Sequence, residues 1–143
     1  MERRASISRT QAVASLFLLL LIPVGFYSKL YKGPAHFWVN NSLSGVFYEI
    51  FWCLFFFLVF PRARAGIIAA SVFLVTSAVE FLQLWQPAFL VPLRNNFFGQ
   101  ALVGNAFTWS DFPYYAAGCL LGWFSMRGIS SAARKGISSP GKS

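Results

Sequence analysis

Long, nearly unbroken apolar stretches constrain this chain more than any other feature of its sequence. Between Phe47 and Phe60 the only charged residue is Glu49. Of the 143 residues, 57% are hydrophobic, 11% are charged and 17 are phenylalanine. A soluble domain of this size lacks the interior volume to bury so many large apolar side chains. The sequence therefore predicts an all-α, polytopic membrane protein.

Four apolar windows are expected to form a four-helix transmembrane bundle, because each approaches the roughly 20 residues that a membrane span needs. They cover residues 12–30, 45–60, 66–85 and 109–126. The first window follows three arginines, as a signal peptide would, but no small-residue cleavage pattern follows Gly25, so we interpret it as a retained anchor. Residues 1–127 are predicted to form one transmembrane domain. Residues 128–143, rich in serine, glycine and basic residues, are predicted to form a disordered cytoplasmic tail.

Basic residues are distributed unevenly between the two sides of these windows. Nine of the 12 lysines and arginines precede the first window, separate the second from the third, or follow the fourth. Because positively charged flanks stay in the cytoplasm, both termini are predicted to be cytoplasmic. Dispersed charges at helix ends beside lipid do not form the basic face that nucleic acid requires, so no nucleic-acid partner is expected.

The sequence carries no recognisable motif for a metal or cofactor. His36 is the only histidine, and no second ligand candidate lies close to it in the sequence. Cys53 and Cys119 both fall inside predicted spans, where free cysteine behaves as a small apolar residue. We therefore expect no metal, no cofactor and no disulfide.

Polar residues interrupt the apolar second half of the chain, and they form the candidate polar site. Ionisable groups at membrane depth are costly unless they find a partner. Glu80 and Gln83 are spaced i, i+3, so their side chains share a face near the outer end of the third window. Asp111 and Tyr115 are spaced i, i+4 at the outer start of the fourth. The candidate polar site comprises Glu80, Gln83, Arg94, Asp111 and Tyr115, with Glu49, Trp109 and Ser110 as secondary candidates.

Two interpretations fit this cluster. In the first, which we favour, Arg94 bridges Glu80 and Asp111 in a structural network that fixes the loop to the helix ends. Ser110 and Asp111 can also cap the fourth helix. In the second, Arg94 recognises an anionic group and Glu80 or Asp111 serves as an acid or base. In either case we expect the charge of Asp111 to matter beyond capping, because Ser110 can cap by itself.

The segment between the third and fourth windows is too long and too apolar for a simple connection. Residues 86–110 are rich in phenylalanine, leucine and valine, and two prolines and two glycines interrupt them. This composition predicts an interfacial or re-entrant segment above the polar cluster.

Gly118 and Gly122 form a GxxxG pattern in the fourth window. Glycines at this spacing let two helices approach closely. We expect them to serve helix packing inside the bundle, with a homodimer contact as the alternative.

The polar motifs resemble those of a known family. An ExxQ at Glu80, the arginine at Arg94 and the pattern G-x-x-F-x-W-S-D-x-x-x-Y-x-x-G at residues 104–118 are similar to the Domain of Unknown Function 2809 family. This resemblance implies a small multi-span protein of the bacterial cytoplasmic (inner) membrane and implies no established activity. A more distant resemblance is to VanZ-like proteins, which share the ExxQ and the arginine. Tyr115 stands where their pattern has asparagine, so the glycopeptide-resistance role is not carried over.

Two classes of function remain open, and with them the question of whether the protein is an enzyme. The chain is most simply interpreted as a noncatalytic accessory or interaction protein with a structural polar cluster. The alternative is a small envelope factor that binds or modifies a lipid-linked or anionic substrate at the outer leaflet. The expected partners are membrane lipid and, in addition, another membrane protein or a second copy of the chain.

Overall fold

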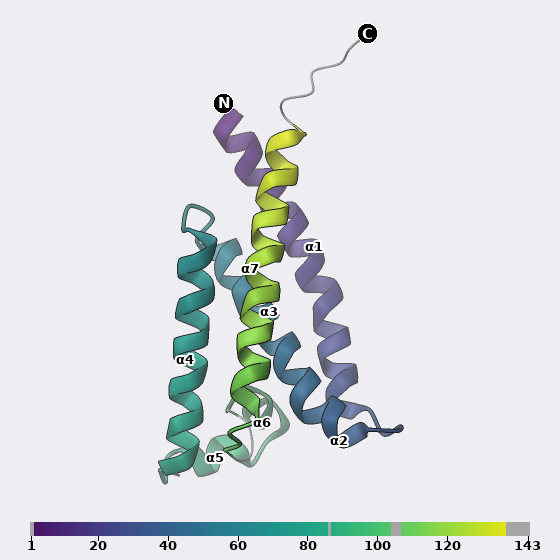
Figure 1. Cartoon of the computed structure of the whole chain (residues 1–143), viewed down its shortest axis with the longest axis vertical. Coiled ribbons are helices and arrows are strands. Elements are labelled where there is room, and N and C mark those ends of the chain that lie inside the picture. Colours follow the sequence, from purple (N-terminus) through teal and green to yellow (C-terminus); the bar gives the residue numbers. More distant parts are fainter. Residues whose placement is uncertain (1, 86, 104–106, 137–143) are drawn as a thin grey trace.

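A computed structural model of the chain describes residues 2–85, 87–103 and 107–136, and every element in these ranges is helical (Figure 1). The long helices are α1 (Glu2–Leu30), α3 (Ser44–Val59), α4 (Ala65–Trp85) and α7 (Asp111–Lys135). The shorter ones are α2 (His36–Trp38), the π-helical turn η1 (Val39–Leu43), α5 (Leu90–Arg94) and α6 (Phe97–Val103). The short helices gather at the end of the molecule where α1 ends and α7 begins (Figure 1). We call this the α5–α6 end.

Backbone conformation and proline set several helix boundaries. Ala35 adopts a left-handed backbone with φ of 58° immediately before α2. Phe60 leaves the helical conformation after α3, and Pro61 follows it. α4 stops at Trp85, two residues before Pro87. Proline lacks an amide hydrogen and cannot continue a helix without a break in its ladder.

The second predicted span begins earlier than its apolar residues indicate. Helical structure runs without interruption from His36 through α2 and η1 into α3, whereas the sequence predicted a start near residue 45. The hydroxyl of Ser44 donates to the backbone carbonyl of Asn40 and, at 3.2 Å, to that of Asn41. Because these bonds satisfy a polar side chain inside the helix, the polar sequence there does not end it.

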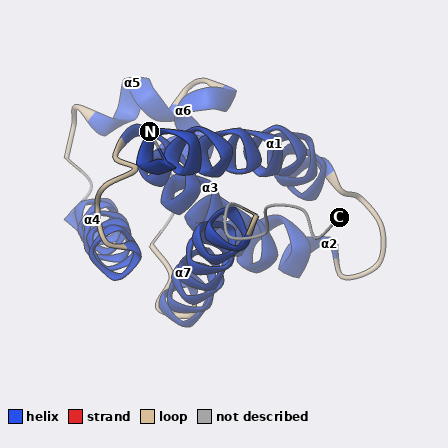
Figure 2. Cartoon of the chain, turned by 90° about the horizontal axis from the view of Figure 1, so that it is seen from above, coloured by secondary structure: helices blue, strands red, loops and turns tan. Residues whose placement is uncertain are grey.

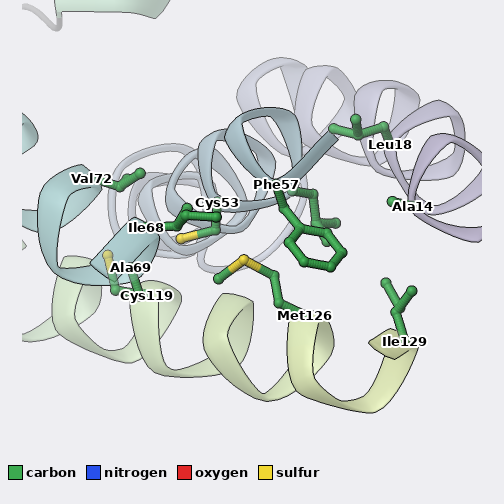
Figure 3. Packing of buried hydrophobic residues seen from close by; sticks show 11 residues of the cluster. Ala14, Leu18, Cys53, Phe57, Ile68, Ala69, Val72, Cys119, Met126 and Ile129 are labelled. Atoms are coloured by element: carbon green, nitrogen blue, oxygen red, sulfur yellow. The ribbon is translucent and has the colours of Figure 1, made fainter. Parts of the chain in front are cut away.

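α3 lies in the middle of the molecule and packs against α1, α4 and α7 (Figure 2). Buried apolar side chains from all four long helices form one core (Figure 3). Phe57 of α3 and Met126 of α7 are among its most deeply buried members, at 4% and 0% exposure. Ala14 of α1 and Ile68 of α4 belong to the same cluster. The core therefore joins residues more than 100 positions apart in the sequence.

Large apolar side chains also cover the outside of the helices. Leu19 of α1 and Leu74 of α4 are 67% and 66% exposed. Soluble monomers rarely expose large continuous apolar patches, whereas lipid favours them. Among the described residues, three helical stretches are long and apolar enough to cross a membrane, and they are Ile7–Leu30, His36–Val59 and Ala65–Trp85. These stretches indicate a membrane protein.

α7 is not among these three stretches. The predicted fourth window at 109–126 is less apolar than the others, because it contains Asp111 and several small residues, and Arg127 follows it directly. α7 nevertheless packs against α1, α3 and α4.

α7 also continues further than the sequence predicted. The expectation of a disordered tail from residue 128 is wrong for residues 128–135, which are helical. Ile129 and Ala133, one turn apart, are buried, so this part of the helix has its own apolar contacts. Residues 137–143 of the predicted tail lie outside the described residues.

Candidate functional site

A hydrogen bond between α4 and α7 is central to the candidate polar site. The hydroxyl of Tyr115 donates to Oε1 of Glu80 over 2.5 Å. Glu80 is 3% exposed. The distance is in the range of hydroxyl to carboxylate bonds, which are stronger than bonds between neutral groups. Tyr115 therefore bonds to a neighbouring helix and not to Asp111 on its own helix.

A second buried carboxyl, that of Glu49 on α3, also bonds to α7. The thiol of Cys119 donates to Oε2 of Glu49 over 2.9 Å, and Glu49 is 0% exposed. The hydroxyl of Thr76 on α4 is a further hydrogen-bond partner of this carboxyl. Glu49, a secondary candidate in the sequence, therefore lies where α3, α4 and α7 meet.

Each of these two carboxyls keeps one oxygen without a partner. Oε1 of Glu49 and Oε2 of Glu80 are buried and accept no hydrogen bond within the described ranges. Gln83, one turn after Glu80, is also buried. A buried polar atom left without a hydrogen bond costs about 1 to 3 kcal/mol. The cluster therefore joins the helices without satisfying all of its own atoms.

Arg94 does not form the bridge that the sequence predicted. It is the last residue of α5, and its Nε and Nη2 atoms are buried with no hydrogen-bond partner among the residues that the structure describes. Within the same residues, no ion pair joins it to Glu80 or Asp111. The cation whose charge acts on Asp111 is Lys29, in the last turn of α1.

The start of α7 carries the remaining predicted site residues. Ser110 occupies the position before the helix, but its side chain makes no capping hydrogen bond. Asp111 is the first helical residue, where a negative charge interacts favourably with the helix dipole. Trp109 is mostly exposed and its ring packs against those of Phe81, Phe107 and Phe112. These aromatic contacts connect the start of α7 to α4.

The two glycines of the GxxxG pattern lie against α3. A Cβ atom at Gly118 would lie 2.6 Å from Cβ of Glu49, and one at Gly122 would lie 2.7 Å from Cβ of Cys53. Both distances are far shorter than any van der Waals contact. The close approach of α7 to α3, and with it the bond from Cys119 to Glu49, therefore depends on glycine at these positions.

A largely apolar cavity of about 320 Å³ lies between α1 and α3. Lys29, Ser44 and Tyr48 supply its polar side chains, and Phe98 of α6 also lines it. It is separate from the hydrogen bonds to α7, because neither Glu49 nor any other member of the candidate polar site lines it.

The described residues contain no group of three histidine, cysteine, aspartate or glutamate side chains that could hold a metal ion. His36 is exposed at the start of α2. Cys53 and Cys119 are free and buried. The hydrogen bonds to α7 bring together two carboxyls, a phenol and a thiol, which are groups that can exchange protons.

Sequence reasoning did not identify Cys119 and Lys29, which interact with residues of the candidate polar site. Cys119 was treated only as a small apolar residue, although Tyr115, Gly118, Cys119 and Gly122 follow an i, i+3, i+4, i+7 pattern that puts them on one helix face. Lys29 was counted only among the three basic residues on the outer side of the predicted windows. Its place in the last turn of a long apolar helix was the sequence feature that could have identified it.

These features are those of a small helical protein with three candidate membrane spans and with buried carboxyls bonded to a less apolar helix. A family model described as "Protein of unknown function (DUF2809)" matches residues 35–119, and the chain belongs to this family. The match includes every candidate residue from Glu49 to Gly118 and excludes α1 and the part of α7 after Cys119. This match gives no support to the resemblance to VanZ-like proteins. No curated protein and no solved structure matches the chain.

Proposed function

We propose that this protein is a noncatalytic accessory or interaction protein of the bacterial inner membrane, and that its polar cluster is structural. The observation that carries the proposal is the pair of hydrogen bonds from α7 to Glu80 and Glu49. Each bond joins α7 to a different apolar helix. Polar side chains that hydrogen-bond across helices commonly stabilise helix association in membranes.

We further propose that α7 is a fourth membrane span. Its 25 residues correspond to about 37 Å of helix, which exceeds the roughly 30 Å of a bilayer core. Leu120 and Phe124 are exposed on the stretch between its charged residues and would face lipid. Contacts with α1, α3 and α4 and the bonds to two buried carboxyls offset its lower apolarity.

The arrangement of the helix ends supports cytoplasmic termini. The start of α1 and the end of α7 lie at the same end of the molecule (Figure 1), and Nη1 of Arg9 donates to the carbonyl of Gly136 over 3.1 Å. Most of the basic residues flank this end, as the positive-inside rule requires for a cytoplasmic side. The α5–α6 end would then lie at the outer leaflet, with α5 and α6, too short to span, in the interface.

A complementation experiment tests the noncatalytic role. Glu49→Gln with Glu80→Gln preserves the size of both side chains and an oxygen acceptor for Cys119 and Tyr115, but it removes both acids. We expect this double variant, present at the wild-type protein level, to complement a deletion strain. Normal protein level without restoration would overturn the noncatalytic role.

A binding function at the outer leaflet is the second candidate, and the unpaired atoms of Arg94 favour it. A buried guanidinium is costly without a partner, and a phosphate group would bond to Nε and Nη2 together. If Arg94 holds such a group, the melting temperature of the purified protein should be higher in inorganic phosphate than in chloride of equal ionic strength. Arg94→Gln should abolish that difference.

A further inference from the structure

The cavity between α1 and α3 is elongated along both helices. Its lining extends from Leu21 to Lys29 on α1 and from Ser44 to Trp52 on α3, about 12 Å along each helix. The two helices run in opposite directions (Figure 1), so Lys29 lies at the Ser44 end. Its volume of about 320 Å³ is within the usual range for small-ligand sites. The cavity is therefore lined mainly by apolar side chains along both helices, with its one charged lining residue at one end.

Lys29 is available to a ligand. It is exposed, and within the described part of the chain its ammonium makes no hydrogen bond or ion pair, although the charge of Asp111 acts on it. Ser44, at the same end, already donates to two backbone carbonyls of its own helix. Lysine readily keeps its stem along apolar surface and its charge at a polar boundary. The charged side chain that lines this end of the cavity is therefore a cation, with the opposite charge of Asp111 near it.

α6 closes one side of the cavity. The ring of Phe97 stacks on that of Phe26 of α1, with centroids 5.9 Å apart, and the next residue, Phe98, lines the cavity. Ile22 and Phe26 on α1 are 41% and 40% exposed, so the rim of the cavity is accessible to the surroundings of the helices. In the proposed membrane placement, these surroundings are lipid chains.

Gly25 leaves the cavity open. It lines the cavity, and a Cβ atom at this position would meet no other atom within 4 Å. A larger side chain at residue 25 would therefore enter the cavity without a clash at its first carbon.

We propose that this cavity binds one acyl chain of an anionic phospholipid, with the lipid phosphate at Lys29. The apolar lining matches the chain, and the cation at the α5–α6 end matches the headgroup. The proposal rests on the proposed membrane placement of α1 and α3, but it does not depend on the role of the polar cluster.

Native mass spectrometry of the full chain tests the proposal. The protein is released from nanodiscs that contain equal amounts of phosphatidylglycerol and phosphatidylcholine, and the lipid it retains is measured. We expect about fivefold more phosphatidylglycerol than phosphatidylcholine, since one lysine near an anionic surface contributes roughly that factor. Lys29→Gln should reduce the ratio to about one, and Lys29→Arg should preserve it. Gly25→Leu should remove the retained lipid by filling the cavity.

Matched controls separate the site from general effects. Lys32→Gln removes a nearby exposed charge that does not line the cavity, and Gly128→Leu adds the same side chain at another helical glycine with open space around it. Both should retain lipid as the wild type does. Equal retention of the two lipids by the wild type, or an unchanged ratio in Lys29→Gln, would overturn the proposal. Topology reporters test the membrane placement independently, so its failure would be distinguishable.

Discussion

Tyr115 and Glu80 are 35 positions apart in the sequence, and their hydrogen bond of 2.5 Å joins the first turns of α7 to the buried face of α4. One turn further along α7, Cys119 makes the equivalent contact with Glu49 of α3. α7 therefore presents two donors, one turn apart, to two carboxyls on different helices. This arrangement gives the least apolar of the long helices polar contacts with two of its neighbours.

Tyr115→Phe should destabilise the protein. The substitution removes the donor to Oε1 of Glu80, a carboxyl whose other oxygen is already buried without a partner within the described ranges. Hydrogen bonds between membrane helices contribute about 0.6 kcal/mol on average and up to about 1.7, so we expect a loss of about 1 kcal/mol. Thermal unfolding in detergent measures it, with Tyr27→Phe at an exposed position as the control. Equal melting temperatures for the two variants would show that the bond contributes nothing.

Gly118→Ala should also destabilise the protein, by a different mechanism. The added methyl group would overlap Cβ of Glu49 at 2.6 Å and the carbonyl oxygen of Val46 at 2.8 Å, which forces α7 away from α3. Overpacking of this kind typically costs about 1 to 3 kcal/mol. Gly128→Ala is the matched control, because nothing lies within 4 Å of its added carbon and alanine favours the helix. A melting temperature of Gly118→Ala at or above that of Gly128→Ala would contradict the close contact.

The apolar pattern of the sequence predicts most of the helical architecture. Continuous apolar residues locate α3 and α4 to within one residue at all four ends, because apolar length and proline decide those boundaries. The start of the second helical stretch was missed, since Asn40, Asn41 and Ser44 resemble a loop until their hydrogen bonds are known. The end of α7 was missed because single apolar residues such as Ile129 give little signal in a basic, serine-rich segment.

The candidate site was predictable in composition but not in its pairing. The cost of isolated charges in an apolar chain identifies Glu49, Glu80 and Arg94 as residues that need a partner. Which partner each one finds depends on how the helices are rotated and how far they are shifted along one another. Spacing within one helix carries no information about either. For that reason the sequence predicted a bridge through Arg94 that the described residues do not form, and it did not predict the bond from Cys119 to Glu49.

Arg94→Gln should not destabilise the purified protein. Nε and Nη2 of Arg94 make no hydrogen bond within the described ranges, so the substitution breaks no bond at these atoms and removes two buried donors that lack acceptors. The backbone carbonyl of Arg94 would still accept from Nε2 of Gln100 over 2.8 Å. The melting temperature in phosphate-free detergent buffer should equal or exceed that of Lys32→Gln. A melting temperature several degrees below that of the control would show that Arg94 makes a stabilising ion pair.

Asp111→Asn should have a small effect on stability and none on function. Neither Arg94 nor Tyr115 bonds to Asp111, so the charge-dependent role that the sequence favoured has lost both expected partners. What remains is its interaction with the helix dipole and, at longer range, with Lys29, and the partial burial of the carboxyl opposes both, so the net change should be at most about 0.5 kcal/mol. Ser110→Ala is the control and should cost less, because Ser110 makes no capping hydrogen bond. Thermal unfolding and complementation of a deletion strain measure the two effects. Loss of complementation by Asp111→Asn at wild-type protein level would show that the carboxylate contacts a ligand, and would favour the outer-leaflet binding function over a structural cluster.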